Sequence, residues 1–293
     1  MEAGGPNTAL VCDTTTYLPS DELRRHGIHL VSLYVSLEGK QQAESEITDY
    51  GEFYDRLRAS DEGATTSQPS VGDFVAVYEP LLSSGREIVS IHLSAGISGT
   101  HEAAVQARQR LIDEGRGGER IHVYDSRSGA GGTGLVALAA AGAAAAGGDA
   151  ASVLERARAA REQLRMWFAV DTLEYLRRGG RIGAARAWLG STLKIKPILT
   201  LEQEITPVER VRTRRRAFER LVDHARELHS GGADAWVVQH VQDPDTAARM
   251  IEECRRDVFG SDPVFVSEVG PVIGAHVGPG LIGVGGVPPS VLE

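Results

Sequence analysis

The chain has 293 residues, of which 42% are hydrophobic and 24% are charged, a composition that predicts a soluble globular protein with material for more than one core. Two cysteines, Cys12 and Cys254, exclude a disulfide framework, and no Cys/His spacing indicates a structural zinc. Residues 1–7 lack the basic and apolar regions of a signal peptide, and the alanine-rich stretch 135–146 is shorter than the roughly 20 residues that span a bilayer. We therefore expect a cytoplasmic protein without a transmembrane segment.

The net charge of −9 is unevenly distributed along the chain. Residues 177–220 contain 12 Arg and Lys but only four Glu, so this segment is basic while the remainder is strongly acidic. Such a distribution predicts a local docking surface rather than a general nucleic-acid binder. A solvated basic face with local ion pairs is the alternative interpretation.

The first half of the sequence alternates short apolar runs with helical patterns. The runs that predict strands are residues 8–13, 28–36, 87–93 and 121–124. Helices are predicted to open at 19–22 and near 71, and to cover 49–59, 101–112, 135–146 and 152–165. Strand, turn and helix in repeated order predict a parallel sheet with crossover helices. We expect the alanine-rich helix to be buried or half-buried.

The second half begins near residue 166 and has strands that follow one another in sequence. Strands are predicted at 166–170, 195–201, 205–212, 235–240, 263–268 and 281–284, the second and third forming a hairpin. Helices are predicted at 217–228 and 247–258, and a further helix should begin with Asp171 as N-cap and Glu174 at the capping-box position. This half is therefore predicted to be α+β, and we divide the chain into domains of residues 1–165 and 166–293.

Two clusters of hydroxyl residues lie where a ligand could bind. In the cluster 65–70, Ser67 or Ser70 can cap the following helix, and the other hydroxyls and free N–H groups can face an anion. The cluster 94–100 follows a predicted strand directly, at the carboxyl edge of the sheet where ligands bind in α/β proteins. A plain glycine-rich turn is the alternative for this second cluster.

Two carboxylates, Asp13 and Asp125, also end predicted strands. They could form an acid–base pair, but nothing in the sequence fixes their separation, and we favour turn-capping roles for both. His276 lies among four glycines and two prolines in residues 270–280, which predicts a rigid loop that positions a donor to a carboxylate or phosphate. The other histidines considered, at 92, 101 and 122, have no such setting and are expected to be ordinary.

Several motifs, taken together and in order, resemble the DegV family over roughly residues 8–286. They are D-T-T at 13–15, T-S-Q-P-S at 66–70, S-G-T at 98–100, D-S at 125–126, D-T-L-E-Y-L-R-R-G-G-R-I at 171–182, K-P-I-L at 196–199, V-R-T-R at 211–214, and G-P-V-I-G with His276 and G-P-G at 270–280. The run 171–182 is the most specific of them.

The resemblance implies a two-domain DegV fold, with an N-terminal parallel-sheet α/β domain, a C-terminal α+β domain and a fatty acid between them. It implies a non-catalytic lipid-binding subunit of a bacterial fatty-acid kinase, which feeds fatty acid into phospholipid metabolism. The partner kinase brings ATP and phosphorylates the acyl carboxylate. By resemblance Thr66, His276 and a serine of the 94–100 loop, Ser94 or Ser98, hold that carboxylate. No metal and no cofactor other than the bound fatty acid is expected.

The basic segment supplies a prediction of its own. We expect Arg177, Arg178 and Arg181 to form the docking surface for the kinase, because complementary charge raises association rates and fixes orientation. Four positions depart from the family pattern: Thr14, Tyr17, Ala95 and His101. Ala95 lacks a hydroxyl whose hydrogen bond would be worth about 1 kcal/mol. None of the four departures removes Thr66, Ser98 or His276, so they bear on acyl preference more than on binding itself.

Two other functions compete with the carrier role. One is a self-sufficient phosphotransferase acting on a small carboxylated or phosphorylated ligand through His276. The sequence disfavours it because there is no nucleotide-cradling loop, no metal-ligand cluster and no Ser/His/Asp signature. The other is nucleic-acid binding through residues 177–220, which the overall acidic charge and the lack of a recognised motif oppose.

Overall fold

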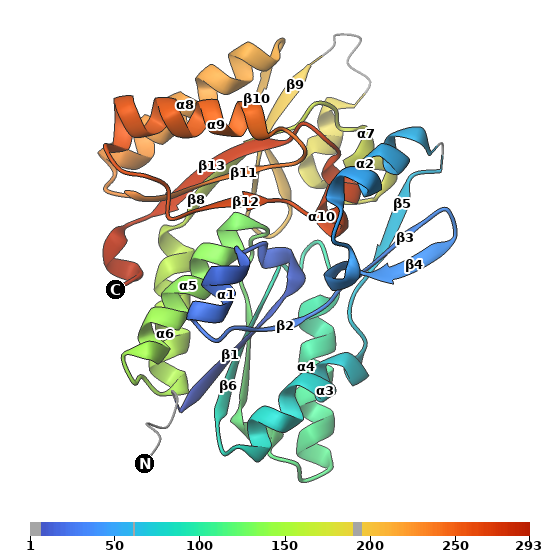
Figure 1. The fold of residues 1–293 in the computed structure, drawn as a ribbon, viewed down its shortest axis with the longest axis vertical. Coiled ribbons are helices and arrows are strands. Elements are labelled where there is room, and N and C mark those ends of the chain that lie inside the picture. The colour runs from blue at the N-terminus through green and yellow to red at the C-terminus, as the bar shows by residue number, and fades with distance from the viewer. Residues whose placement is uncertain (1–6, 61, 190–194) are drawn as a thin grey trace.

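The computed structural model describes residues 7–60, 62–189 and 195–293 (Figure 1). Residues 1–6, which bear on the expected absence of a signal peptide, and residues 190–194 of the basic segment lie outside this description. No helix in the described part of the chain is long and apolar enough to cross a membrane.

A four-stranded parallel sheet forms the first half, in the order β2-β1-β6-β7. Its strands are β1 (Thr8–Asp13), β2 (His29–Val31), β6 (Glu87–His92) and β7 (Ile121–Asp125). Leu10 and Cys12 of β1 pack with helices α5 (Gly131–Ala145) and α6 (Ala150–Gln163). Ala9 and Val11 pack on the opposite face with α3 (Val71–Ser83) and α4 (Thr100–Asp113). Burial on both faces explains why the strand has an uninterrupted apolar sequence.

The second half contains a six-stranded mixed sheet in the order β10-β9-β8-β13-β11-β12. Its strands are β8 (Arg165–Ala169), β9 (Lys196–Leu201), β10 (Ile205–Val211), β11 (Ala235–His240), β12 (Phe265–Glu268) and β13 (Ile282–Val287). Helices α8 (Arg214–Ser230) and α9 (Pro244–Cys254) cover one face, and α9 continues into a π-helical turn over 255–259. The predicted hairpin is confirmed as the antiparallel pair β9–β10.

The alanine-rich helix α5 packs against both sheets, since it shares a core with β1 and with β11 and β13 (Figure 1). Twelve of its 15 residues are buried, which confirms the expectation of a buried helix. Its small side chains permit this close approach: a Cβ on Gly134 would meet the Phe265 ring, and one on Gly142 the backbone of Leu292. The proposed domain division between residues 165 and 166 falls at the start of β8, although α5 packs against the sheets of both proposed domains.

A third, antiparallel sheet was not predicted from the sequence. It consists of β3 (Tyr34–Leu37), β4 (Lys40–Ala43) and β5 (Ala64–Ser67) in the order β4-β3-β5, with α2 (Tyr50–Ala59) beside it (Figure 1). The run 28–36, predicted as one strand, is two strands in two sheets. The chain changes sheet at Ser32 and Leu33, where no glycine or proline marks a break.

Two further predictions about local structure are wrong. Asp171 does not cap a helix; it accepts from Lys196 Nζ at 2.9 Å and from Arg214 Nε at 2.8 Å, and α7 (Glu174–Arg178) begins three residues later. The segment containing His276 is not a loop: Pro271 occupies the first turn of a short helix, α10 (Pro271–Val277). Proline is common at the first helical position because the N–H group that it lacks would have no acceptor within the helix. Helix α1 (Ser20–Arg25) completes the α-helices of the described residues.

The structure resolves which serine of the 65–70 cluster caps α3. Ser70 Oγ accepts from Asp73 N at 3.1 Å while Asp73 Oδ2 accepts from Ser70 N at 2.8 Å, which is a reciprocal capping box. We predict that Ser70→Ala lowers the free energy of unfolding by about 1 kcal/mol because the first turn loses an acceptor. Ser67→Ala, the matched control, should change it by less than about 0.5 kcal/mol. Urea denaturation measures both, and equal losses would contradict the assignment.

Candidate functional site

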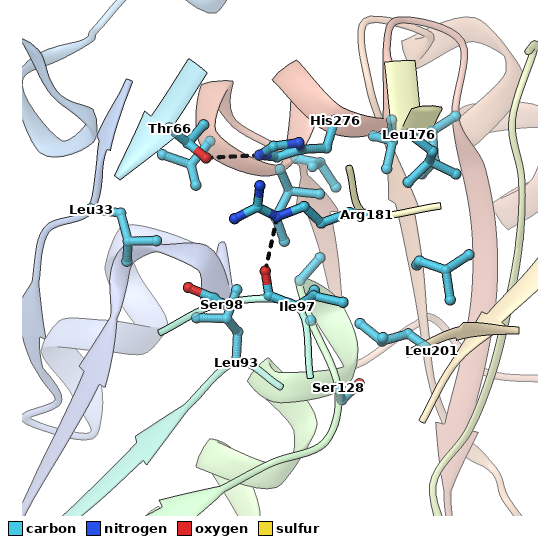
Figure 2. Close-up of a pocket in the computed structure, with 18 of the residues that line it drawn as sticks. Leu33, Thr66, Leu93, Ile97, Ser98, Ser128, Leu176, Arg181, Leu201 and His276 are labelled. Atoms are coloured by element: carbon cyan, nitrogen blue, oxygen red, sulfur yellow. Dashed lines mark hydrogen bonds between the residues drawn. The ribbon is translucent and has the colours of Figure 1, made fainter. Parts of the chain in front are cut away.

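A cavity of about 380 Å³ lies where the two large sheets and the small sheet meet. Apolar side chains from both halves of the chain line it, among them Phe168. Figure 2 shows five others, Leu33, Leu93, Ile97, Leu176 and Leu201. Volumes of about 300–1,000 Å³ are usual for sites that bind small molecules. The walls are therefore suited to an apolar ligand.

Polar side chains gather at one end of this cavity. Thr66 Oγ1 and His276 Nε2 lie 2.7 Å apart, and the two residues are separated by 210 positions in the sequence. Figure 2 shows the Arg181 guanidinium just below this pair, with Ser98 on the loop beneath it. The structure thus brings together three of the four residues predicted to bind a carboxylate, and adds an arginine. We call Thr66, Ser98, Arg181 and His276 the head-group site.

The backbone positions of Thr66 and His276 follow from local packing. Thr66 is on β5, paired with Val35 of β3, and His276 is in the last turn of α10. Gly179, at the end of α7, lies against the imidazole so closely that a Cβ there would collide with His276 Nδ1. Nδ1 is buried and has no hydrogen-bond partner among the described residues. A glycine at 179 is therefore required for the imidazole to reach the cavity.

Arg181, predicted as a docking residue, lines the cavity instead of standing on an exposed face. Its Nε donates to the Ile97 carbonyl at 3.1 Å and its Nη1 to the Gly179 carbonyl at 2.8 Å. These bonds hold the guanidinium in place through Nε and Nη1. Sequence reasoning selected this arginine only as a docking residue and missed its place at the cavity, although it lies inside the most specific motif and follows two glycines.

The geometry separates the two candidate serines. Ser98 lines the cavity, and its Oγ lies 2.9 Å from Thr100 Oγ1. Ser94 is fully buried outside the cavity lining, and its Oγ donates to the Gln203 carbonyl at 2.7 Å. Ser94 is therefore a structural link between the loop and the turn that joins β9 to β10, and Ser98 is the one available to a ligand.

Asp13 and Asp125 hold the loop that carries Ser98. Asp13 Oδ2 accepts from Leu93 N at 3.0 Å, and Asp125 Oδ1 accepts from Ala95 N at 3.1 Å. Each carboxylate also accepts a hydrogen bond from the backbone N–H two residues later in the chain, Asp13 from Thr15 and Asp125 from Arg127. Both predicted turn-capping roles are confirmed. A paired acid–base role is not supported, because Asp13 is completely buried.

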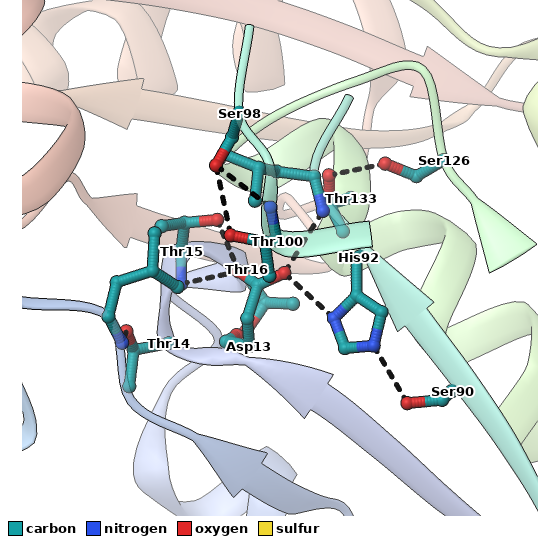
Figure 3. A network of polar contacts seen from close by, with 12 residues as sticks. Asp13, Thr14, Thr15, Thr16, Ser90, His92, Ser98, Thr100, Ser126 and Thr133 are labelled. Atoms are coloured by element: carbon teal, nitrogen blue, oxygen red, sulfur yellow. Dashed lines mark hydrogen bonds and ion pairs between the residues drawn. The ribbon is translucent and has the colours of Figure 1, made fainter. Parts of the chain in front are cut away.

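His92 was expected to be ordinary but belongs to a buried network of polar contacts (Figure 3). Its Nδ1 lies 3.1 Å from Asp13 Oδ2 and its Nε2 lies 2.7 Å from Ser90 Oγ. Ser90 Oγ in turn lies 2.7 Å from Tyr78 OH. The order Ser–His–Asp matches a hydrolytic triad, but these side chains are buried without access to solvent. This network therefore provides hydrogen bonds for the buried Asp13 carboxylate rather than performing catalysis.

The imidazole of His276 is neutral at physiological pH. Burial, followed by the nearby Arg181 charge, lowers its pKa to about 4. A neutral imidazole has one donor and one acceptor nitrogen, so it can share a proton with Thr66 in either direction. The fixed positive charge at this end of the cavity comes from Arg181. This combination attracts an anion.

The other two predicted docking arginines are exposed on α7. Arg177 Nη2 and Arg178 Nε donate to Glu174 Oε1 at 2.6 Å and 2.7 Å. These bonds lower the pKa of Glu174 to about 2. Exposed pairs of this kind contribute about 0–1 kcal/mol to stability.

The described residues contain no group of three His, Cys, Asp or Glu that could hold a metal ion.

Comparison with known proteins places the chain in a family. A protein-family model, described as an uncharacterised protein of the DegV family, matches residues 7–288 of this chain. A DegV domain-containing protein of Streptomyces coelicolor is 41% identical over 95% of this chain and 97% of its own length. Protein DegV of Bacillus subtilis is 34% identical over 95% and 98%. The chain belongs to the DegV family.

Solved structures agree with this assignment. A DegV family protein from Thermus thermophilus, described by its fatty acid binding, has a TM-score of 0.85 and 33% identity over 96% of this chain and 99% of its own. DegV of Bacillus subtilis, described as a fatty acid binding protein, has a TM-score of 0.83, 33% identity and the same coverage. The predicted fold, a parallel-sheet N-terminal part and a C-terminal sheet covered by helices, is the fold of this family.

We predict that His276 stays neutral in the ligand-free protein until the pH approaches about 4. An unfolded chain takes up this proton near pH 6.5, so the stability contributed by the neutral imidazole is present above pH 6.5 and is lost as the pH falls toward 4. Nuclear magnetic resonance titration of the His276 imidazole carbon measures this pKa. A midpoint near the ordinary value of 6.5 would contradict the described burial.

Proposed function

We propose that this protein binds a long-chain fatty acid and presents its carboxylate to a separate ATP-dependent fatty-acid kinase. The observation that carries the proposal is the cavity itself, an apolar space that ends in the head-group site. DegV proteins of Thermus thermophilus and Bacillus subtilis described as binding fatty acids support it. The protein acts as a lipid-binding subunit, and the kinase supplies the catalysis.

The two parts of the cavity have different tasks in this proposal. The apolar walls take the acyl chain, whose burial contributes about 0.8 kcal/mol for each CH₂. Thr66, Ser98 and Arg181 hold the carboxylate, with His276 completing the hydrogen bonds. Arg181 is the one permanent charge in the group, and the acyl carboxylate would neutralise it. Bound carboxylate should therefore raise the pKa of His276 by compensating the Arg181 charge that lowers it.

The surface beside the head-group site supports access by a kinase. A second depression, of about 340 Å³, shares Thr66, Arg181 and His276 with the cavity and extends to Tyr175 and Arg178 on α7. A partner that docks on α7 therefore comes close to the carboxylate. We retain Arg177 and Arg178 as docking residues and assign Arg181 to the head-group site.

The binding proposal predicts that purified protein contains about one fatty acid per chain. Arg181→Met should weaken fatty-acid affinity roughly tenfold to a hundredfold, because a hydrogen bond to a charged group contributes about 1.5–3 kcal/mol. Thr66→Val and Ser98→Ala should each cost about 1 kcal/mol. Organic extraction with mass spectrometry and displacement of a fluorescent fatty acid measure these effects. A protein without lipid that also binds no added fatty acid would refute the proposal.

The docking proposal predicts that Arg177→Ala combined with Arg178→Ala lowers kinase-dependent acyl-phosphate formation about tenfold through slower association. Fatty-acid affinity should change less than about twofold, because exposed pairs contribute little to the fold. Activity should also fall with added salt. Arg215→Ala, an exposed arginine on α8, is the matched control and should have no effect. Equal loss of fatty-acid binding in the double variant would move these arginines into the pocket.

A further inference from the structure

The helix that carries His276 begins in an unusual way. The first N–H groups of any helix lack acceptors within the helix itself. In α10, Val272 N donates to Glu44 Oε1 at 2.8 Å and Ile273 N donates to Tyr17 OH at 3.1 Å. Both acceptors come from the first 44 residues of the chain, more than 220 positions away. The first turn of α10 is thus capped by side chains from another part of the molecule.

Glu44 is a buried carboxylate without a cationic partner. Only 2% of its surface is exposed, and no basic side chain in the described chain pairs with it. Its oxygens instead accept from Thr14 Oγ1 at 2.6 Å, from Tyr17 OH at 2.7 Å and from Val272 N. Burying an unpaired carboxylate is costly. Because such a carboxylate lowers the stability of the fold, its presence indicates that it positions the groups around it.

The surrounding glycines show how tightly this first turn is held. A Cβ on Gly274 would collide with Tyr54 OH, and one on Gly270 would meet the Tyr17 ring. Tyr54 OH lies 2.9 Å from the carbonyl oxygens of both Val269 and Gly270. The seven-residue helix is therefore fixed at its start by side chains from 17, 44 and 54. Little freedom to slide or rotate remains.

We propose that Glu44 is a positioning residue for the head-group site: together with Tyr17 it fixes the register of α10 that places His276 opposite Thr66. Val272 and His276 are four residues apart, so they lie on the same face of the helix, about 6 Å from each other along its axis. A shift at Val272 is thus passed directly to the imidazole. The inference rests on the proposed function, since it concerns how the carboxylate of a fatty acid is selected.

The arrangement requires Glu44 to accept hydrogen bonds from three donors, which the ionised carboxylate does best. Burial raises its pKa to about 7, and the hydrogen bonds from Thr14, Val272 and Tyr17 lower it only in part. The other titratable groups that face this region are Asp13 from β1, Tyr17 after β1, Tyr50 and Tyr54 from α2, and Glu268 from β12. Burial raises the pKa of all three phenols, so Glu44 is the group that titrates near neutrality.

The test compares two probes that differ only in the head group, oleic acid and oleyl alcohol. The ratio of the alcohol Kd to the acid Kd measures head-group selection, while the alcohol Kd alone measures the acyl cavity. For Glu44→Ala we expect the ratio to fall about tenfold through loss of charge-assisted hydrogen bonds. The alcohol Kd should change less than the acid Kd, although Val272 and Val277 of α10 also line the cavity. Glu44→Gln, which resembles the protonated acid and keeps the shape, should lower the ratio about threefold.

Two further readouts separate positioning from mere stability. In the wild type the ratio should fall as the pH is lowered from about 8 to about 6, and in Glu44→Gln this fall should be smaller, because the variant lacks the Glu44 carboxyl that titrates in this interval. The imidazole resonances of ligand-free His276 should shift in Glu44→Gln. Glu46→Gln, an exposed glutamate two positions further along, is the matched control and should leave both readouts unchanged.

The outcomes distinguish this inference from the proposed function. If the wild-type protein binds neither probe, the proposed function is wrong and the inference is wrong with it. If the wild type prefers the acid but Glu44→Gln shows the same ratio, the same pH profile and the same His276 resonances, fatty-acid binding stands and the positioning role is refuted. Should Glu44→Ala fail to fold, Glu44→Gln alone decides between these results.

Discussion

The candidate site depends on one long-range contact, between Thr66 on β5 and His276 on α10. Neither residue reaches the cavity by itself: the small sheet brings Thr66 to its edge, and α10 brings His276 from the other end of the chain. Gly179 contributes by the absence of a side chain, since it allows α7 to lie against the imidazole. Three segments that are remote in sequence therefore converge on a single hydrogen bond, and the head-group site exists only in the complete fold.

The parallel sheet and its crossover helices could be predicted because their signals are local. The apolar run 8–13 and the alanine-rich helix show their burial in their own composition. The small sheet could not, because β5 is a run of hydroxyl residues that equally suits a loop. Helix α10 was mistaken for a loop for a related reason. The four glycines and two prolines of residues 270–280 favour a loop when the sequence is considered alone, but in the structure Gly274 provides room for Tyr54 within a short helix.

The charge pattern shows another limit of sequence reasoning. Part of the positive charge in residues 177–220 is compensated, because Arg177 and Arg178 pair with Glu174, and Arg214 pairs with Asp171. Both acids lie just before the segment, so a count along the sequence leaves them out. The same count cannot separate Arg181, held by backbone carbonyls at the cavity, from arginines in solvent. Three-dimensional pairing decides which charges remain available.

The division between chain and head group has a consequence for the proposed carrier. Burial of a dozen methylenes would contribute about 10 kcal/mol, whereas a charge-assisted hydrogen bond contributes about 1.5–3 kcal/mol. Affinity then comes mainly from the acyl cavity, and the head-group site determines where the carboxylate lies. A subunit that hands its ligand's carboxylate to another protein needs that position more than it needs extra affinity. The buried Glu44, unfavourable for stability and linked through α10 to His276, is consistent with such a requirement.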